Sequence, residues 1–255
     1  MNNRIKARVL SLLIVVLLTV TGCVTEVQNQ PAGDPEKYLA TLIKLGVGYL
    51  RNGDYQRSKE KLQTALKQDS KSVEAHTTLG LLYQIQLEDK LAEKHFKKAI
   101  GYDSENAQAR LNYGAFLFTK GRYKEAIEHL TVAAEDTTYR NQPQAYENLA
   151  VCYAQMGDNN KAEQFYRKAL GLNPRLSKSL LAMSEMKFNE TNYMESLRYY
   201  RAYLDSSQQT ARSLWLGIRL AKIFGNKDEE QNYGMVLEKI FPGTTEYKQY
   251  KESLR

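Results

Sequence analysis

From residue 39 onward, apolar residues recur three and four positions apart, which is the periodicity of an amphipathic helix. A longer period is superimposed on this one. A short motif occurs four times, at intervals of 34, 34 and 36 residues. It consists of a leucine or tyrosine, then a small residue and, three positions after the small residue, a second bulky residue. The four copies begin at Leu45, Leu79, Tyr113 and Leu149. This period predicts stacked helix pairs, because a single pair cannot bury both of its faces.

The turn inside each pair has its own sequence signature, since glycine adopts the left-handed conformation that ends many helices. One turn position is shared by Gly53, Gly121, Gly157 and Gly225, with Leu87 and Thr191 in the two remaining units. The repeated motif and the shared turn position together predict six units. A polar capping helix is expected at 245–255, because the end of a repeat array needs a polar outer face. The units are 39–72, 73–106, 107–140, 143–176, 177–210 and 211–244.

This pattern resembles the tetratricopeptide repeat (TPR) family over nearly all of residues 39–242. The resemblance implies an all-α fold, a right-handed superhelical solenoid of six helix-turn-helix repeats over residues 38–255. The first four units keep the pattern. The fifth has Ser184 and Tyr203 at positions where small residues are usual, and the sixth has Ile218 at such a position.

The N-terminal segment predicts export from the cytoplasm. Arg4, Lys6 and Arg8 precede an apolar run over residues 9–20, which is too short to span a bilayer but suits a secretory signal. The run ends in Val-Thr-Gly-Cys at residues 20–23, which resembles the bacterial lipobox. The resemblance implies a signal peptide over residues 1–22, acylation of Cys23 with fatty acids such as palmitate, and a flexible tether over 23–37. An ordinary signal peptide with a chance cysteine is the alternative.

The composition and charge argue against several classes of function. The formal charge is +7 over 255 residues, but without the three signal cations it falls to +4, so nucleic acid is not an expected partner. Two cysteines exclude a disulfide-stapled scaffold and a four-cysteine zinc site. Dispersed histidines and the absence of a nucleophile–base spacing predict no metal, no catalytic residue and no cofactor beyond the covalent lipid.

A protein-binding surface therefore remains as the expected function. In the TPR family, ligands lie along the face that the first helices of the units line, and this resemblance selects positions two, five, nine, twelve and thirteen. An apolar peptide is expected to dock there. For each of these side chains taken alone, packing in the core is the alternative interpretation. The predicted groove comprises Ile43, Val47, Leu50, Leu81, Ile85, Leu111 and Phe118, and a possible second, basic surface comprises Arg212, Trp215, Arg219 and Lys222.

The combination of lipobox, short tether and six units resembles the pilotin family of type IV pilus biogenesis, of the PilF/PilW type. Residues 22–55 and 193–205 carry this resemblance together with the chain length. It implies a non-enzymatic outer-membrane lipoprotein on the periplasmic face, consistent with Val24 rather than aspartate after Cys23. It further implies delivery by the lipoprotein-sorting machinery, binding of the secretin subunit, secretin multimer assembly and twitching motility. A periplasmic TPR adaptor that scaffolds cell-wall enzymes is the alternative.

Overall fold

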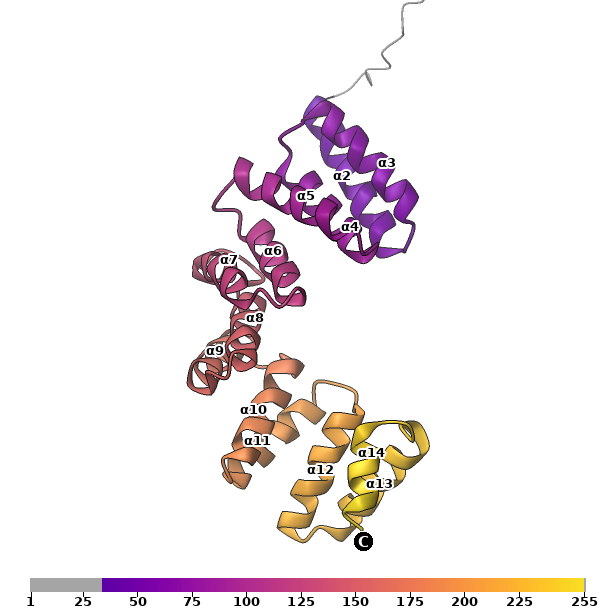
Figure 1. The fold of residues 1–255 in the computed structure, drawn as a ribbon, viewed down its shortest axis with the longest axis vertical. Coiled ribbons are helices and arrows are strands. Elements are labelled where there is room, and N and C mark those ends of the chain that lie inside the picture. Colours follow the sequence, from indigo (N-terminus) through magenta and orange to yellow (C-terminus); the bar gives the residue numbers. More distant parts are fainter. Residues whose placement is uncertain (1–33, 255) are drawn as a thin grey trace, which may run out of the picture. The chain divides into compact units, whose positions relative to one another are not determined.

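The computed structural model describes residues 34–254, so Cys23 and the predicted signal peptide lie outside the described residues. Within residues 34–254 there are thirteen α-helices and no strand, which confirms the predicted all-α class (Figure 1). The helices are α2 (Pro35–Arg51), α3 (Tyr55–Gln68), α4 (Val73–Ile85), α5 (Asp89–Tyr102), α6 (Ala107–Thr119), α7 (Tyr123–Glu135), α8 (Gln142–Gln155), α9 (Asn159–Leu172), α10 (Ser177–Asn189), α11 (Tyr193–Leu204), α12 (Ala211–Phe224), α13 (Lys227–Ile240) and α14 (Thr245–Glu252).

The first helix begins earlier than the predicted tether allows. Because α2 starts at Pro35, the last three tether residues, 35–37, are helical rather than flexible. Proline is suited to the first helical position, since it has no N–H to leave unpaired and its φ is already helical. The Asp34 carboxylate also accepts a hydrogen bond from the backbone nitrogen of Glu36 at 3.0 Å. The compact body of the chain begins at Thr41, and the packing described below lies within it.

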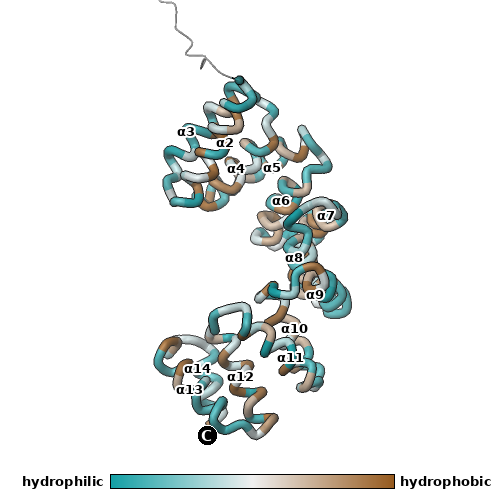
Figure 2. Tube along the Cα trace, turned by 180° about the vertical axis from the view of Figure 1, so that it is seen from behind, coloured by the Kyte–Doolittle hydropathy of each residue, from teal (hydrophilic) through white to brown (hydrophobic). Residues whose placement is uncertain are grey.

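Glycines inside the first helices allow the two helices of a pair to approach closely. A Cβ atom placed on Gly46 would lie 2.7 Å from the Leu62 side chain, and one on Gly80 would lie 2.7 Å from the Phe96 ring. Figure 2 shows hydrophobic and hydrophilic residues alternating along these helices, as amphipathic packing requires. The small residues of the repeat pattern therefore mark contacts between helices.

The fifth unit replaces the glycine contact by hydrogen bonds. The Ser184 hydroxyl of α10 donates to the Ser196 carbonyl of α11 at 2.9 Å, and the Ser196 hydroxyl donates to the Ser184 carbonyl at 2.8 Å. Both serines are fully buried, so these bonds satisfy groups that would otherwise be costly to bury. Ser184 thus fits the close-approach position with a different pair of contacts.

The predicted turn position is uniform in backbone conformation. All four glycines at this position have φ between 69° and 80°. Leu87 and Thr191 adopt the same conformation, with φ of 60° and 59°. A left-handed conformation is unfavourable for leucine and for β-branched threonine, so these two turns carry local strain.

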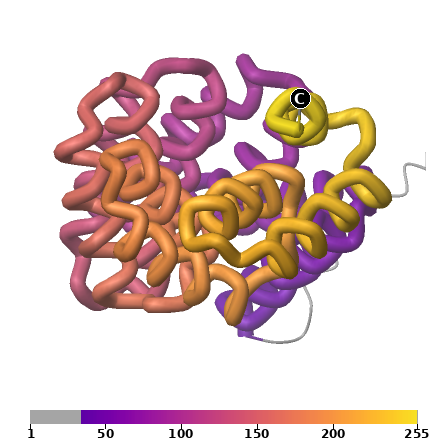
Figure 3. Tube along the Cα trace, turned by 90° about the horizontal axis from the view of Figure 1, so that it is seen from below, coloured from indigo at the N-terminus to yellow at the C-terminus, as the bar shows by residue number. Residues whose placement is uncertain are grey.

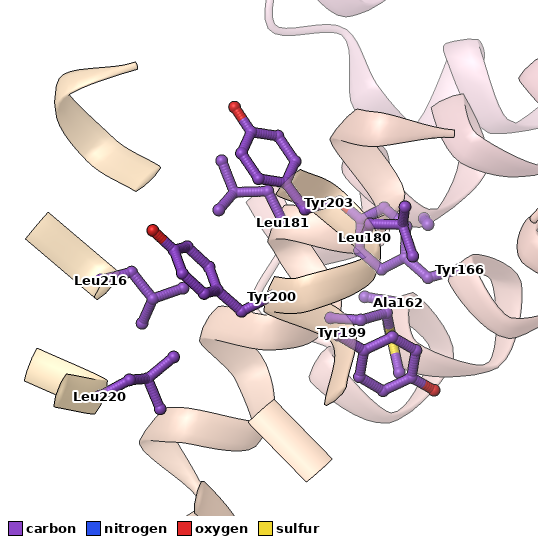
Figure 4. Close-up of a cluster of buried hydrophobic side chains, with 11 residues drawn as sticks. Ala162, Tyr166, Leu180, Leu181, Tyr199, Tyr200, Tyr203, Leu216 and Leu220 are labelled. Atoms are coloured by element: carbon purple, nitrogen blue, oxygen red, sulfur yellow. The ribbon is translucent and has the colours of Figure 1, made fainter. Parts of the chain in front are cut away.

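Tyrosines make up much of the core between the fourth and sixth units. Tyr166 of α9 and Tyr200 of α11 are both buried, and Figure 4 shows Tyr200 facing Leu216 of α12. Burial raises the pKa of the Tyr166 hydroxyl to about 12. The abundance of tyrosine in the sequence is thus partly a packing feature of this core.

The last helix closes the C-terminal end of the array. α14 packs against α12 and α13 (Figure 3). Its Tyr247 and Tyr250 lie against a small core of Ala211, Leu214, Ile218 and Leu237. A Cβ atom on Gly234 of α13 would clash with the Tyr250 ring, so the glycine makes room for this helix. The capping segment thus combines a polar outer face with two aromatic contacts.

Candidate partner-binding grooves

A groove of about 390 Å³ lies across the first helices of the first three units. We call it the N-terminal groove. Its apolar lining comes from Val47 of α2 and from Val73 and Leu81 of α4. Its polar lining residues are Arg51, Glu74, Thr77, Thr78, Asn106, Gln108 and Asn112. The groove therefore offers apolar contacts and hydrogen-bonding side chains together, a mixture typical of ligand sites.

Several polar groups of the N-terminal groove already have partners within the chain. The Thr77 and Thr78 hydroxyls donate to the carbonyls of Val73 and Glu74 at 2.8 Å. The Asn106 side chain accepts from the backbone nitrogen of Ala109 and caps α6. These bonds fix the walls of the groove, so a ligand meets surfaces that are already ordered.

Two predicted groove residues line the N-terminal groove and two others are buried. Val47 and Leu81 line it. Ile43 is only 5% exposed and Leu111 only 8%, so assigning them to an open surface was wrong. Both occupy position five of their units, where Thr77 and Glu147 are buried as well. This position faces the seam between successive first helices, which contact each other directly, as α4 and α6 do.

The other three predicted groove residues lie at the C-terminal ends of the first helices. Leu50 and Phe118 are half-buried, and Ile85 is 49% exposed. None of them lines the N-terminal groove. Phe118 packs against Tyr123, with the two ring centroids 5.5 Å apart. Lining side chains that the pattern did not select include Thr78 and Asn112, both at position six of their units.

A second groove, of about 520 Å³, lies over the fourth and fifth units and ends at Arg212. We call it the C-terminal groove. Val151, Ala154, Leu181, Ala182 and Met186 form its apolar part. Its polar lining comes from Gln155, Asn159, Tyr166, Lys178, Glu185, Asn189 and Arg212.

Most cations of the predicted basic surface are engaged within the chain. The Arg212 guanidinium makes a two-pronged ion pair with the Glu185 carboxylate. Lys222 donates to the Ser253 hydroxyl at 3.2 Å and lies 3.6 Å from a Glu230 carboxylate oxygen. Of the four predicted residues, only Arg212 lines the C-terminal groove. The surface is thus less basic than the sequence alone indicates.

Arg219 is held between two aromatic rings. Its guanidinium carbon lies 4.4 Å from the centroid of the Phe188 ring and 5.4 Å from that of Trp215. Burial lowers the pKa of this guanidinium from its ordinary value. Its Nε atom is buried and has no hydrogen-bond partner.

The histidines and the remaining cysteine have packing roles in the described part of the chain. Nδ1 of His76 lies 2.9 Å from Nδ1 of His95, and His129 contacts an Arg110 nitrogen at 2.8 Å. Cys152 is buried, which raises the pKa of its thiol to about 12. Between residues 34 and 254, no group of three or more histidine, cysteine or acidic side chains is arranged to hold a metal ion.

Sequence comparison identifies the family. Models described as tetratricopeptide repeat match residues 43–85 and 105–175. The type IV pilus assembly protein PilF of Pseudomonas aeruginosa is 35% identical over 244 residues, which cover 94% of this chain and 97% of that protein. The chain belongs to the PilF family of type IV pilus assembly proteins. The resemblance to type IV pilus biogenesis proteins found in the sequence is thereby confirmed.

Solved structures agree with membership in the PilF family. The structure of Pseudomonas aeruginosa PilF matches with a TM-score of 0.84 at 36% identity, covering 86% of this chain and 99% of that one. The crystal structure of PilW, a widely conserved type IV pilus biogenesis factor, matches with a TM-score of 0.72 at 25% identity, covering 83% and 97%. These relationships support a role in type IV pilus biogenesis. In the described part of this PilF-family chain, no helix has the length and apolarity needed to cross a membrane.

Proposed function

We propose that the chain is a lipid-anchored pilotin of the outer membrane that binds type IV pilus secretin subunits and promotes their assembly into multimers. The N-terminal groove carries this proposal. Val47, Val73 and Leu81 suit apolar side chains of a bound segment, while Gln108 and Asn112 suit its backbone groups. An extended apolar segment of the secretin is therefore the proposed ligand, shielded until the multimer forms.

The proposed anchor is acylated Cys23, which lies outside the described residues. Each buried methylene of an acyl chain contributes about 0.8 kcal/mol, so several chains keep the protein at the membrane. The lipoprotein-sorting machinery would carry the chain, with its bound secretin subunit, to the periplasmic face of the outer membrane. Pilus formation and twitching motility would then depend on this delivery.

Two groove variants test secretin binding in the full chain. Val47→Arg and Leu81→Arg place a charge on the apolar lining of the N-terminal groove and should reduce co-purified secretin at least tenfold. Ile85→Arg is the matched control, because Ile85 lies on α4 with Leu81 but is exposed outside the groove. Equal secretin recovery from all three variants would contradict the assignment of the groove.

A third variant tests the anchor separately. Cys23→Ser removes the acylated sulfur and leaves the N-terminal groove unchanged. It should retain secretin binding but lose the outer-membrane location of both proteins, measured by membrane fractionation. An unchanged distribution would contradict the anchor. A cell-wall adaptor would instead bind soluble wall enzymes and leave secretin recovery independent of the groove.

A further inference from the structure

The outer face of α5 is formed almost entirely by lysines. With 3.6 residues per turn, positions 90, 94, 97, 98 and 101 of this helix fall within an arc of about 100°. These positions hold four lysines and a glycine, and all five residues are exposed. The buried residues of α5 lie on the opposite side of the helix. We call the four lysines the lysine face: Lys90, Lys94, Lys97 and Lys98.

Comparison among the repeats shows that this face is unusual. The same five positions carry net charges of 0, −1, +2, +1 and 0 in units one, three, four, five and six, against +4 in unit two. The cations of unit four are Arg167 and Lys168, and both are engaged. Arg167 pairs with Glu163, and Lys168 lies 5.5 Å from the centroid of the Tyr146 ring. Unit two therefore differs from the others in its number of free cations on this arc.

The acidic side chains near the lysine face do not neutralise it. Asp89 already forms an ion pair with the third unit at 2.6 Å, and Glu93 lies 2.9 Å from both Lys97 and Arg122. Glu88, just before α5, is exposed and leaves one carboxylate to balance the remaining charge. Three lysines take part in none of the ion pairs formed by residues 34–254: Lys90, Lys94 and Lys98. The net charge of the face is therefore positive.

Exposed apolar and aromatic side chains lie at the two ends of the lysine face. Leu87 comes three residues before Lys90, is 83% exposed and has a φ of 60°, which is unfavourable for leucine. Packing within the described residues therefore does not account for this leucine. Tyr102 follows Lys98 by one turn and is 43% exposed. Basic residues next to leucine and tyrosine are typical of surfaces that lie in the headgroup region of a bilayer.

We propose that the lysine face, with Leu87 and Tyr102, rests on an anionic phospholipid surface. The ammonium groups would pair with lipid phosphates, and the Leu87 side chain would enter the boundary between headgroups and acyl chains. A flat bilayer suits this convex helix face, and no residue of α5 lines either groove. The contact leaves both grooves free, and it rests neither on acylation of Cys23 nor on secretin binding.

Acetylation of lysines in the full chain tests the proposal. The chain is reconstituted into vesicles of phosphatidylcholine alone, or of phosphatidylcholine and phosphatidylglycerol in equal parts, and mass spectrometry follows the reaction of each lysine. At low salt, Lys90, Lys94 and Lys98 should react about fivefold more slowly in the anionic vesicles, which corresponds to about 1 kcal/mol per lysine. This protection should weaken at about 0.5 M salt, because salt screens exposed charges. Lys239 is the matched control, because it is exposed at the corresponding arc of α13, and its rate should not change.

Two leucine variants test the apolar contact. Leu87→Gly should reduce the protection at least about twofold, because it removes the inserted side chain. Leu172→Gly should not, since it removes another exposed leucine from the end of α9. Thermal unfolding shows that both variants are folded.

Equal rates in the two kinds of vesicle, or full protection in Leu87→Gly, would overturn the proposal. Protection that requires added outer-membrane proteins would also overturn it, because an acidic protein would then cover the lysine face. So would protection that rises with chain concentration in the absence of vesicles, because a second copy would then cover it. The comparison is between two lipids, so its outcome is independent of secretin binding.

Discussion

One carboxylate oxygen of Glu147 accepts hydrogen bonds from both the backbone nitrogen and the hydroxyl of Ser179, at 3.0 and 2.8 Å. Ser179 is the third residue of α10, whose preceding residue, Leu176, has no side-chain group to cap the helix. Free N–H groups at a helix start need such acceptors. Glu147 lies on α8 and is 7% exposed, so the fourth unit supplies the cap for the fifth.

Removing this cap should weaken the contact between the two units. Glu147→Ala should lower the free energy of unfolding by about 1–3 kcal/mol, because it leaves buried donors of Ser179 unsatisfied. Urea denaturation followed by circular dichroism measures the change. Gln144→Ala is the control on the same helix, since the Gln144 Oε1 atom has no hydrogen-bond partner. Equal losses in both variants would contradict the role of Glu147.

The strained turn at Leu87 should become more stable when glycine replaces it. Leu87 has a φ of 60° and is 83% exposed, so Leu87→Gly relieves backbone strain and loses little packing. We expect a gain of about 1 kcal/mol in unfolding free energy. Gly121→Leu makes the reverse change at the equivalent turn and should cost a similar amount. A lower melting temperature for Leu87→Gly would contradict this account of the turn.

The close contact of α4 and α5 should not tolerate even one methyl group. Gly80→Ala places a Cβ atom 2.7 Å from the ring of Phe96, which is fully buried and packs against the rings of Tyr113 and Phe116. Overpacking of this kind costs about 1–3 kcal/mol. Gly101→Ala is the matched control, because Gly101 of α5 has no atom within 4 Å of the added carbon. It should be neutral or stabilising by up to about 1 kcal/mol.

The His76–His95 pair should make stability depend on pH. Burial lowers the pKa of both imidazoles, that of His95 to about 4, and the positive charges of Lys94 and Lys98 add to the effect at His95. Asp69 has a smaller, opposite effect on His76. Between about pH 6.5 and pH 4 the unfolded chain therefore binds more protons than the folded chain.

The unfolding free energy should consequently fall as the pH is lowered from about 6.5 to 4. His95→Gln should make this dependence shallower, because it removes the group with the larger shift. Urea denaturation at pH 7 and pH 5 measures the effect, and His129→Gln gives a comparison at another, half-buried imidazole whose pKa is also lowered. An unchanged dependence in His95→Gln would show that the pair does not titrate as described.

The repeat architecture was predictable because its sequence signals are local. Gly46, Gly80 and Gly114 all make the close helix contacts that their spacing indicates. The turn position also holds where glycine is absent, at Leu87 and Thr191, where the turn has the same backbone hydrogen bonds as at Gly53. The role of Ser184 could not be predicted from the sequence. A buried pair of serines that replaces a glycine contact has no recognisable pattern in a single sequence.

The grooves were less predictable, because exposure of a first-helix residue depends on the neighbouring unit. Ile43 and Leu111 follow the surface positions of the TPR family but face the seam between helices. Asn112 lines the groove from position six, which the family pattern does not select, so no feature of the sequence marked it. Ion pairs between units, such as that of Arg212 with Glu185, join residues 27 positions apart, and no local pattern marks such a pair.

The central claim is that the N-terminal groove supports secretin assembly. The most direct measurement is the amount of heat-stable secretin multimer in outer-membrane fractions of a strain without the chain, complemented by the unchanged chain, Leu81→Arg or Ile85→Arg at equal abundance. We predict normal multimers with the unchanged chain and with Ile85→Arg, and few with Leu81→Arg. Normal multimers with Leu81→Arg, or in the strain without the chain, would contradict the claim.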